Sequence, residues 1–170
     1  VGEVVTRRLG RTLLELGGNN AIIVTRTADL DLAMSAILFG AVGTAGQRCT
    51  TTRRIILHHS LRGILTRRLI NAYRQVPIGN PLNPGTLMGP LINTRAVKDM
   101  QDALAAVRQQ GGHILYGGEV LKGVKYPSGC YVRPCLVAAP HDLKIVHEDT
   151  FAPILYLITY RTLDQAIAYH

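Results

Sequence analysis

The sequence has 170 residues and is 47% hydrophobic, which is enough apolar content for one sizeable core and excludes general disorder. Its formal net charge is +8, but the basic residues are scattered in short pairs and aromatic residues make up only 5%, so we expect no nucleic-acid partner. No apolar run is long enough to span a membrane, and three cysteines favour a reducing compartment over a disulfide framework.

The first part of the chain predicts two strands followed by a helix. Residues 11–16 and 20–25 are β-branched or leucine-rich runs separated by two glycines, a pattern typical of strands. Asp29 is a suitable N-cap, and the apolar residues after it recur at three- and four-residue spacing. We therefore expect a helix that begins after Asp29 and ends at Gly43 and Gly46.

The middle of the chain predicts a strand, two helices and an irregular connection. The run RRIILHH is expected to be a strand, and Ser60 is expected to cap a helix whose apolar face continues to Val76. Residues 77–90 are dense in proline, glycine and asparagine, which indicates an irregular surface connection. A further helix is expected from about Thr94 to Gln110.

The last part of the chain predicts three strands and a short helix. The runs HILYGG, YVRPCLV and PILYLITY are expected to be strands, and Thr162 and Gln165 have the spacing of a capping box. Strands that alternate with helices in this way predict an α/β fold with a largely parallel sheet flanked by helices. Because both ends of the sequence are abrupt, we expect a segment from the middle of a longer chain.

Two short stretches carry the candidate chemistry. The stretch ELGGNNA, residues 15–21, places a carboxylate at the end of an apolar run, where a solvated charge is the simplest interpretation. The stretch GTAGQRC, residues 43–49, ends in a cysteine that by itself would suit a small buried core position. The polar, glycine-rich setting of Cys49 and the adjacent Arg48 favour instead a reactive thiolate, which would need a base nearby.

These stretches resemble the catalytic core of the aldehyde dehydrogenase family. In that family a Leu-Glu-Leu-Gly-Gly motif carries the general base and a Gly-Gln-x-Cys motif carries the nucleophile, and LELGGNNA and GAVGTAGQRCT are similar to them. GNPLNPGTLMGPLI and EDTFAPIL are similar to two further motifs, and all four follow the family's order between residues 13 and 155. The stretches AVGTAGQRCTTTRR and TFAPILY most resemble the antiquitin branch, the α-aminoadipic semialdehyde dehydrogenases.

The resemblance implies NAD-dependent oxidation of an aldehyde, such as a semialdehyde acid, to a carboxylic acid through a cysteine thioester. Cys49 would be the nucleophile, and Glu15 would be the base that activates the hydrolytic water, a role that suits a partly desolvated carboxylate at a strand end. Arg48 would bind the distal carboxylate of the substrate. From the residue alone, Arg48 could equally be an exposed strand-edge charge or a charge that tunes the thiol.

The resemblance also implies a set of cofactor-binding residues. Gly2 would end the loop that binds the pyrophosphate of NAD, and Leu16 and Gly17 would lie where cofactor and substrate approach the backbone. Asp149 and Phe151 stand where the family has a Glu that binds the nicotinamide ribose and a Phe that packs beside the nicotinamide. Asp149 is one methylene shorter than Glu, which leaves its reach to the ribose open, and Phe151 as an ordinary core residue remains an alternative.

The domain organisation follows from the same resemblance. Residues 1–14 are expected to be the tail end of a dinucleotide-binding domain, and residues 15–170 a catalytic domain that is incomplete at its C-terminus. The full-length enzyme is expected to form homo-oligomers in the cytoplasm or the mitochondrial matrix.

Two alternative functions remain open. One is a CoA-acylating relative, although the retained Glu15 counts against it, and the other is an inactive fragment that serves as an interaction module. The cysteines and histidines show no metal-ligand spacing, so we expect no metal.

Overall fold

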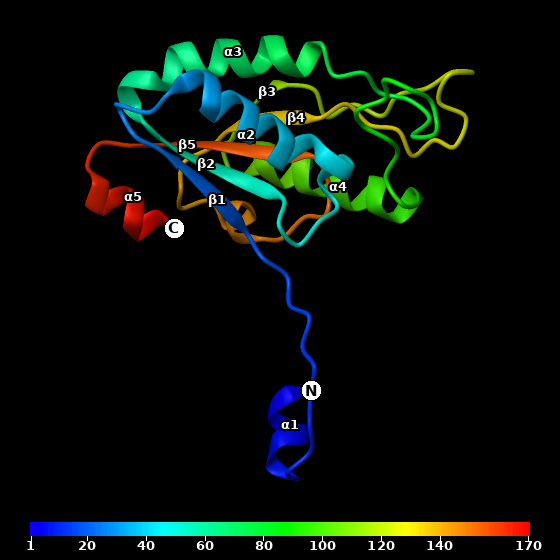
Figure 1. Ribbon diagram of the computed structural model, residues 1–170, viewed down its shortest axis with the longest axis vertical. Coiled ribbons are helices and arrows are strands. Elements are labelled where there is room, and N and C mark those ends of the chain that lie inside the picture. Colours follow the sequence, from blue (N-terminus) through cyan, green and yellow to red (C-terminus); the bar gives the residue numbers. More distant parts are fainter.

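A computed structural model describes residues 1–170 and contains a five-stranded sheet with helices on both faces (Figure 1). The strands are β1 (Asn20–Val24), β2 (Thr52–His58), β3 (His113–Tyr116), β4 (Cys135–Ala138) and β5 (Ile154–Tyr160). Their order in the sheet is β1-β2-β5-β4-β3, and every neighbouring pair is parallel except β3 and β4. The predicted α/β fold with a largely parallel sheet is confirmed.

The two central strands β2 and β5 are buried on both faces. Their apolar residues form continuous runs rather than an alternating pattern, as expected for parallel strands that are covered by helices on both sides. All residues of β2 except His58, and all of β5 except Thr159, are buried. The sheet is therefore the centre of the core, and its strand ends are the places where polar groups reach the surface.

Four helices cover this sheet, and three of them have an N-cap residue whose side chain accepts a backbone hydrogen bond. They are α2 (Leu30–Val42), α3 (Arg62–Arg74), α4 (Thr94–Gln109) and α5 (Leu163–Tyr169). Asp29, Asn93 and Thr162 each accept a backbone N–H of the first turn of α2, α4 and α5 respectively. None of the helices in the structure combines the length and the hydropathy that a membrane crossing requires.

The predicted start of α3 is wrong. Ser60 does not cap the helix, because a short 3₁₀ turn, η2 (His59–Leu61), is inserted between β2 and α3 and Leu61 occupies the N-cap position. His58 Nδ1 accepts the backbone N–H of Ser60 and lies 2.7 Å from its Oγ atom. The serine hydroxyl is thus used within the turn instead of at the helix terminus.

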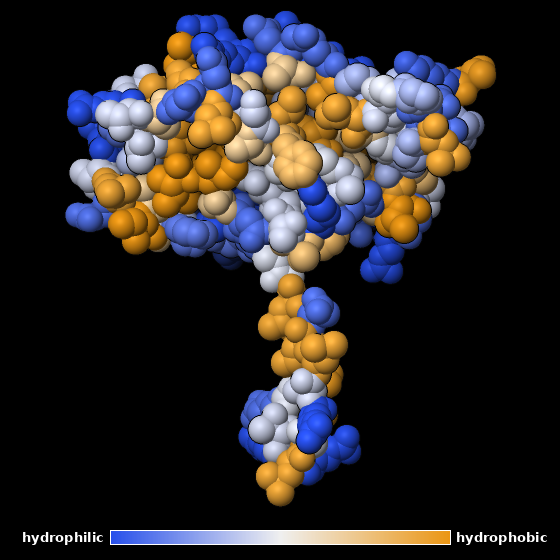
Figure 2. All heavy atoms as spheres, in the orientation of Figure 1, coloured by the Kyte–Doolittle hydropathy of each residue, from blue (hydrophilic) through white to orange (hydrophobic).

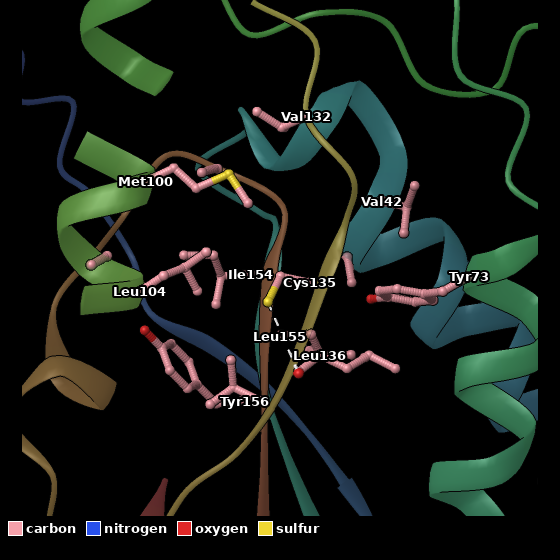
Figure 3. Packing of buried hydrophobic residues seen from close by; sticks show 14 of the residues in the cluster. Val42, Tyr73, Met100, Leu104, Val132, Cys135, Leu136, Ile154, Leu155 and Tyr156 are labelled. Atoms are coloured by element: carbon pink, nitrogen blue, oxygen red, sulfur yellow. Dashed lines mark hydrogen bonds between the residues drawn. The ribbon is translucent and has the colours of Figure 1, made fainter. Parts of the chain in front are cut away.

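The helices pack on opposite faces of the sheet. Figure 3 shows Met100 and Leu104 of α4 on one side of β4 and β5, and Val42 of α2 and Tyr73 of α3 on the other. All four side chains are fully buried in one continuous hydrophobic core. The apolar faces that the sequence predicted for these helices are the faces that pack on the sheet.

Residues 11–16 do not form the predicted strand. They belong to an N-terminal arm, residues 1–17, which leaves the sheet below β1 and ends in the short helix α1 (Gly2–Arg7) (Figure 1). A strand needs a partner for its backbone hydrogen bonds, and no segment of the chain pairs with residues 11–16. Leu13 and Leu16 are consequently exposed, and Figure 2 shows the apolar side chains of the arm facing solvent.

Two other predictions concern the second half of the chain. Residues 77–90 are irregular, as predicted, apart from an isolated bridge between Ile78 and Met88. The strand predicted in YVRPCLV is shorter than expected, because β4 begins only at Cys135. Before it, Val132 makes a single bridge to Val120, and Pro134 lacks the N–H that a longer ladder requires.

Candidate active site

The segments that contain the candidate catalytic and cofactor-binding residues meet at the amino ends of three adjacent parallel strands. Residues 15–19 precede β1, residues 43–51 precede β2 and residues 147–153 precede β5. Since β1, β2 and β5 are neighbours in the sheet and run in the same direction, their amino ends lie at one edge. The order of the strands therefore brings together segments that are up to about 130 residues apart, as the contact between Gly18 and Asp149 shows.

Cys49 follows a tight turn that requires a glycine. In the 3₁₀ segment η1 (Gly43–Gly46) the residues Thr44, Ala45 and Gly46 have φ values of 52°, 53° and 72°. A Cβ atom on Gly46 would collide with the backbone of Ala152 in the segment that precedes β5. Positive φ and close backbone approach both select glycine here, so the turn before Cys49 lies directly against the turn before β5.

The backbone around Cys49 is held by hydrogen bonds, whereas its thiol is exposed. Asn20 Nδ2 donates to the carbonyl oxygens of Cys49 at 2.6 Å and Thr51 at 3.1 Å, and the N–H of Arg48 donates to Thr51 Oγ1 at 3.1 Å. The N–H of Cys49 itself donates to no group of the chain. Cys49 is exposed, so the interpretation of this residue as a small buried hydrophobe is wrong.

Gln47 connects this turn to the irregular connection after α3. Its Nε2 donates to the carbonyl oxygens of Thr44 at 3.1 Å and Pro90 at 3.4 Å, and its Oε1 accepts the N–H of Ile92 at 2.8 Å. A pocket of about 630 Å³ opens beside these groups, lined by Thr44, Gln47, Pro90, Ile92 and, from the segment before β5, Phe151. Half of its lining residues are hydrophobic.

Glu15 does not stand at a strand end. It lies in the N-terminal arm, is exposed, and makes no hydrogen bond or ion pair. The expectation of a partly desolvated carboxylate held at a strand tip is therefore wrong for this structure. The reason is the absence of a partner strand for residues 11–16, which leaves the segment around Glu15 extended and unpaired.

The paired glycines after Glu15 do allow a close approach. A Cβ atom on Gly17 would lie 2.7 Å from Asp149 Oδ2, and one on Gly18 would lie 3.3 Å from the carbonyl oxygen of Cys49. The N–H of Gly18 donates to Asp149 Oδ2 at 3.3 Å. The backbone that follows Glu15 thus contacts both Cys49 and Asp149.

Arg48 is directed away from the pocket in this structure. Its Nη2 donates to the carbonyl oxygen of Phe39 at 2.9 Å, and its guanidinium carbon lies 4.9 Å from the centre of the Phe39 ring. Phe39 is on α2 and is largely exposed. Only Nη2 of the guanidinium donates a hydrogen bond to the chain, and Nε is buried without an acceptor.

Asp149 and Phe151 lie beside each other and share one partner, Arg53. The Asp149 carboxylate forms an ion pair with Arg53 Nε, and the Phe151 ring centre is 4.9 Å from the guanidinium carbon. Phe151 is 45% exposed and lines the pocket, so the alternative of an ordinary core residue is wrong. Both residues belong to the segment before β5, which packs against the turn before Cys49 at Gly46.

Gly2 lies away from this edge of the sheet, whereas Leu16 lies near it but does not line the pocket. Gly2 begins α1 at the end of the N-terminal arm, beside the side chain of Leu14, and Leu16 is exposed on the arm itself (Figure 1). Neither residue is among those that line the pocket with Phe151. Their predicted roles toward the cofactor remain predictions.

Sequence reasoning missed two residues that organise the site, Asn20 and Arg53. Asn20 holds the carbonyl oxygen of Cys49, and Arg53 holds Asp149 and Phe151. A signal for Arg53 was present in RRIILHH, because a charged residue inside a run that is otherwise typical of a doubly buried strand needs a buried partner. For Asn20 the only signal was its place immediately before the apolar residues of β1.

Cys49 should be the most reactive of the three cysteines. Cys130 and Cys135 are buried, and burial raises the pKa of the Cys135 thiol to about 12. At pH 8 a thiol with that pKa is thiolate in roughly one molecule in ten thousand, and the thiolate is the form that reacts. We expect iodoacetamide to alkylate Cys49 first in the folded full-length protein, as followed by peptide mass spectrometry. Equal rates for the three cysteines would contradict a nucleophilic role.

Comparison with known proteins gives consistent matches over the whole chain. A protein-family model described as the aldehyde dehydrogenase family matches residues 1–170. The chain is 48% identical over 168 residues to aldehyde dehydrogenase family 7 member A1 of Pisum sativum, covering 99% of this chain and 32% of that protein. It is 46% identical over 171 residues to α-aminoadipic semialdehyde dehydrogenase of Rattus norvegicus, covering 100% of this chain and 31% of that protein.

Solved structures show the same fold. Betaine aldehyde dehydrogenase from Staphylococcus aureus in complex with NAD⁺ superposes with a TM-score of 0.94 at 26% identity, over 99% of this chain and 34% of that chain. Lactaldehyde dehydrogenase from Escherichia coli superposes with a TM-score of 0.90 at 31% identity, over 99% of this chain and 35% of that chain. The chain spans about a third of the length of the relatives that it matches.

Proposed function

The chain belongs to the aldehyde dehydrogenase family, and we propose that it provides the catalytic segment of an enzyme that uses NAD to oxidise an aldehyde to a carboxylic acid. The observation that carries this proposal is the exposed Cys49, which follows a turn whose residues Thr44 and Gln47 line a pocket and whose backbone is approached by Gly18 after Glu15. Residues 15–170 would form the catalytic domain. Residues 1–14 would belong to a dinucleotide-binding domain, which agrees with the exposed apolar side chains of the arm (Figure 2).

Cys49 begins the reaction as the nucleophile. Its thiolate adds to the carbonyl carbon of the aldehyde, the carbon–oxygen double bond opens, and a thiohemiacetal oxyanion results. The N–H of Cys49 is free to donate to this oxyanion, because it has no partner within the chain. The carbonyl oxygen of Cys49 is fixed by Asn20, which keeps its peptide unit in a defined orientation.

The thiohemiacetal then loses a hydride and becomes a thioester of Cys49, and NAD, when bound, supplies the hydride acceptor. The residues present fit the nicotinamide end of this cofactor. Phe151 offers an exposed aromatic face in a pocket that is half apolar, and Asp149 offers a carboxylate beside it. We propose these two residues as the contacts to the nicotinamide and its ribose.

Glu15 completes the cycle as the base for hydrolysis. It takes a proton from water, the water oxygen adds to the thioester carbon, and the carbon–sulfur bond breaks to release the acid and the Cys49 thiolate. Glu15 is three positions before Gly18, which contacts the backbone of Cys49. Such a segment spans at most roughly 11 Å, and residues 15–17 have no backbone partner that would hold the carboxylate away from the thioester.

We propose a semialdehyde acid, such as α-aminoadipic semialdehyde, as the substrate. The relatives at 44–48% identity include proteins named α-aminoadipic semialdehyde dehydrogenase. Arg48 precedes Cys49 in the chain and keeps guanidinium donors that no group of the chain accepts. A rotation of this side chain away from Phe39 would let it pair with a carboxylate at the far end of the substrate.

The proposed function is tested by the formation of NADH when the full-length protein is given NAD and an aldehyde. We expect turnover with a semialdehyde acid and slower turnover with an aliphatic aldehyde of similar length. Turnover that requires CoA and yields an acyl-CoA would favour the CoA-acylating alternative. No turnover with any aldehyde would contradict the proposal.

Replacing Arg48 with alanine should change the choice of substrate. The loss of a hydrogen bond to a charged group costs about 1.5–3 kcal/mol, so kcat/KM for the semialdehyde acid should fall roughly 10- to 150-fold. Values of kcat/KM for an aliphatic aldehyde should change little, because that substrate has no distal carboxylate. An equal loss for both substrates would show that Arg48 serves the thiol or the fold instead.

A further inference from the structure

Arg53 is a charged residue in the interior of the sheet. Its side chain is only 2% exposed, and it stands in β2 between Thr52 and Arg54, ahead of the apolar run that completes the strand. The burial lowers the pKa of the Arg53 guanidinium, while the adjacent Asp149 carboxylate opposes this shift. Because an arginine remains protonated in proteins, β2 carries a fixed positive charge that must be matched by nearby groups.

The partners of Arg53 all lie in the two turns that form the site. Its Nη1 donates to the carbonyl oxygens of Gly46 at 3.2 Å and Thr150 at 2.6 Å. The Asp149 carboxylate pairs with its Nε, and the ring of Phe151 lies on its guanidinium. One side chain therefore joins the turn before Cys49 to the segment before β5.

Asp149 continues this connection to the first strand. One carboxylate oxygen pairs with Arg53, and the other accepts the N–H of Gly18 at 3.3 Å. Gly18 is also the residue whose backbone approaches the carbonyl oxygen of Cys49. The chain of contacts from Arg53 through Asp149 to Gly18 thus crosses the amino ends of β5, β2 and β1.

Stability alone does not account for this arrangement. Replacement of a buried ion pair by apolar residues of similar size is often neutral or stabilising, because the cost of desolvating both charges offsets their attraction. Moreover, the buried Nη2 of Arg53 has no acceptor in the chain, which is a further cost. The planar guanidinium of Arg53 instead holds three neighbouring groups in fixed positions at the same time.

We propose that Arg53 is the positioning residue for the nicotinamide end of the cofactor site, holding the Asp149 carboxylate and the Phe151 ring in place against the turn of Cys49. This inference rests on the proposed function for the identity of the cofactor. Arg53 acts through its two neighbours. A change at Arg53 should therefore weaken NAD binding even where the protein remains folded.

The test compares NAD affinity with thermal stability in the full-length protein. We expect Arg53→Met to raise the Kd for NAD, measured by titration calorimetry, by roughly 10- to 150-fold, the range for loss of contacts to a charged group. Arg53→Lys keeps the charge but lacks the fork, so its Kd should lie between those of the wild type and Arg53→Met. The proposal would be overturned if both variants had a Kd for NAD within twofold of the wild-type value. If Arg53→Met does not fold, a Kd within twofold of the wild type in Arg53→Lys would be enough to overturn it.

A double-mutant cycle tests whether Arg53 acts through Asp149. If it does, Arg53→Lys combined with Asp149→Asn should bind NAD about as weakly as the weaker single variant, whereas independent roles would give the sum of the two losses. The matched control is Arg133→Met, which removes an arginine that pairs with Glu119 between β3 and β4 and should leave the Kd unchanged. A lowered Tm with unchanged Kd in the Arg53 variants would assign Arg53 to the fold alone.

Failure of the inference and failure of the proposed function can be told apart. Calorimetry measures NAD binding without an aldehyde, so the Arg53 comparison stands even if the wild type oxidises no aldehyde. A wild type that binds NAD but shows no oxidation would contradict the proposed function and leave the Arg53 result valid. A wild type that binds no NAD would overturn both.

Discussion

Replacing Cys49 with alanine is expected to abolish NAD-dependent aldehyde oxidation in the full-length protein. Without the thiol no thiohemiacetal forms, so the aldehyde hydrogen is never presented as a hydride donor. The loss of a covalent nucleophile costs up to about 10⁶-fold in kcat in other acyl-transfer enzymes. We therefore expect NADH formation to fall to the level of a blank reaction in a steady-state absorbance assay.

The structure offers a matched control for this experiment. Cys130 is buried in the hydrophobic core outside the site, where its Sγ hydrogen-bonds to the carbonyl oxygen of Ser128. Cys130→Ala removes a thiol of the same size and should keep kcat close to the wild-type value. Substantial turnover in Cys49→Ala, or equal losses in the two variants, would remove Cys49 from the mechanism.

Replacing Glu15 with glutamine should separate the two halves of the reaction. A general base contributes about 10²–10⁴-fold, so steady turnover should fall by that amount because hydrolysis of the thioester becomes slow. The first half of the reaction does not use Glu15, and each active site should still produce one NADH in a rapid first phase. Stopped-flow absorbance resolves the first phase from the steady rate that follows it.

Glu3→Gln is the control for Glu15→Gln. Glu3 is a second exposed carboxylate of the N-terminal arm, paired with Arg7 within α1. Its removal changes the charge of the arm by the same amount and should leave both phases intact. An unchanged steady rate in Glu15→Gln would favour the simple interpretation of Glu15 as a solvated charge.

The elements of the fold could be predicted because their signals are local. The cap at Asp29, the apolar periodicity of α4 and the β-branched runs of β2 and β5 depend on neighbouring residues only, and the structure confirms them. The strand predicted over residues 11–16 failed for a non-local reason. A strand is stable only beside another strand, and nothing in the pattern of those residues says whether a partner exists.

The site could be predicted only in part for the same reason. Motifs identified Cys49, Asp149 and Phe151 individually, but their proximity depends on the strand order β1-β2-β5, which is set by pairing between distant segments. Arg53 acquires its role only when the turn at Gly46 and the segment at Asp149 are folded against it. A residue whose partners are all distant in sequence carries little local signal.

The proposed mechanism requires a thioester that forms on Cys49 and is hydrolysed with the help of Glu15, and this thioester can be trapped. Full-length Glu15→Gln is mixed with NAD and a semialdehyde acid, quenched in acid within the first phase, digested and examined by mass spectrometry. We predict that the peptide with Cys49 gains the mass of the aldehyde less one hydride and one proton, and that hydroxylamine removes the group. An unmodified Cys49 in a sample that has formed NADH, or an acyl group on another residue, would contradict the mechanism.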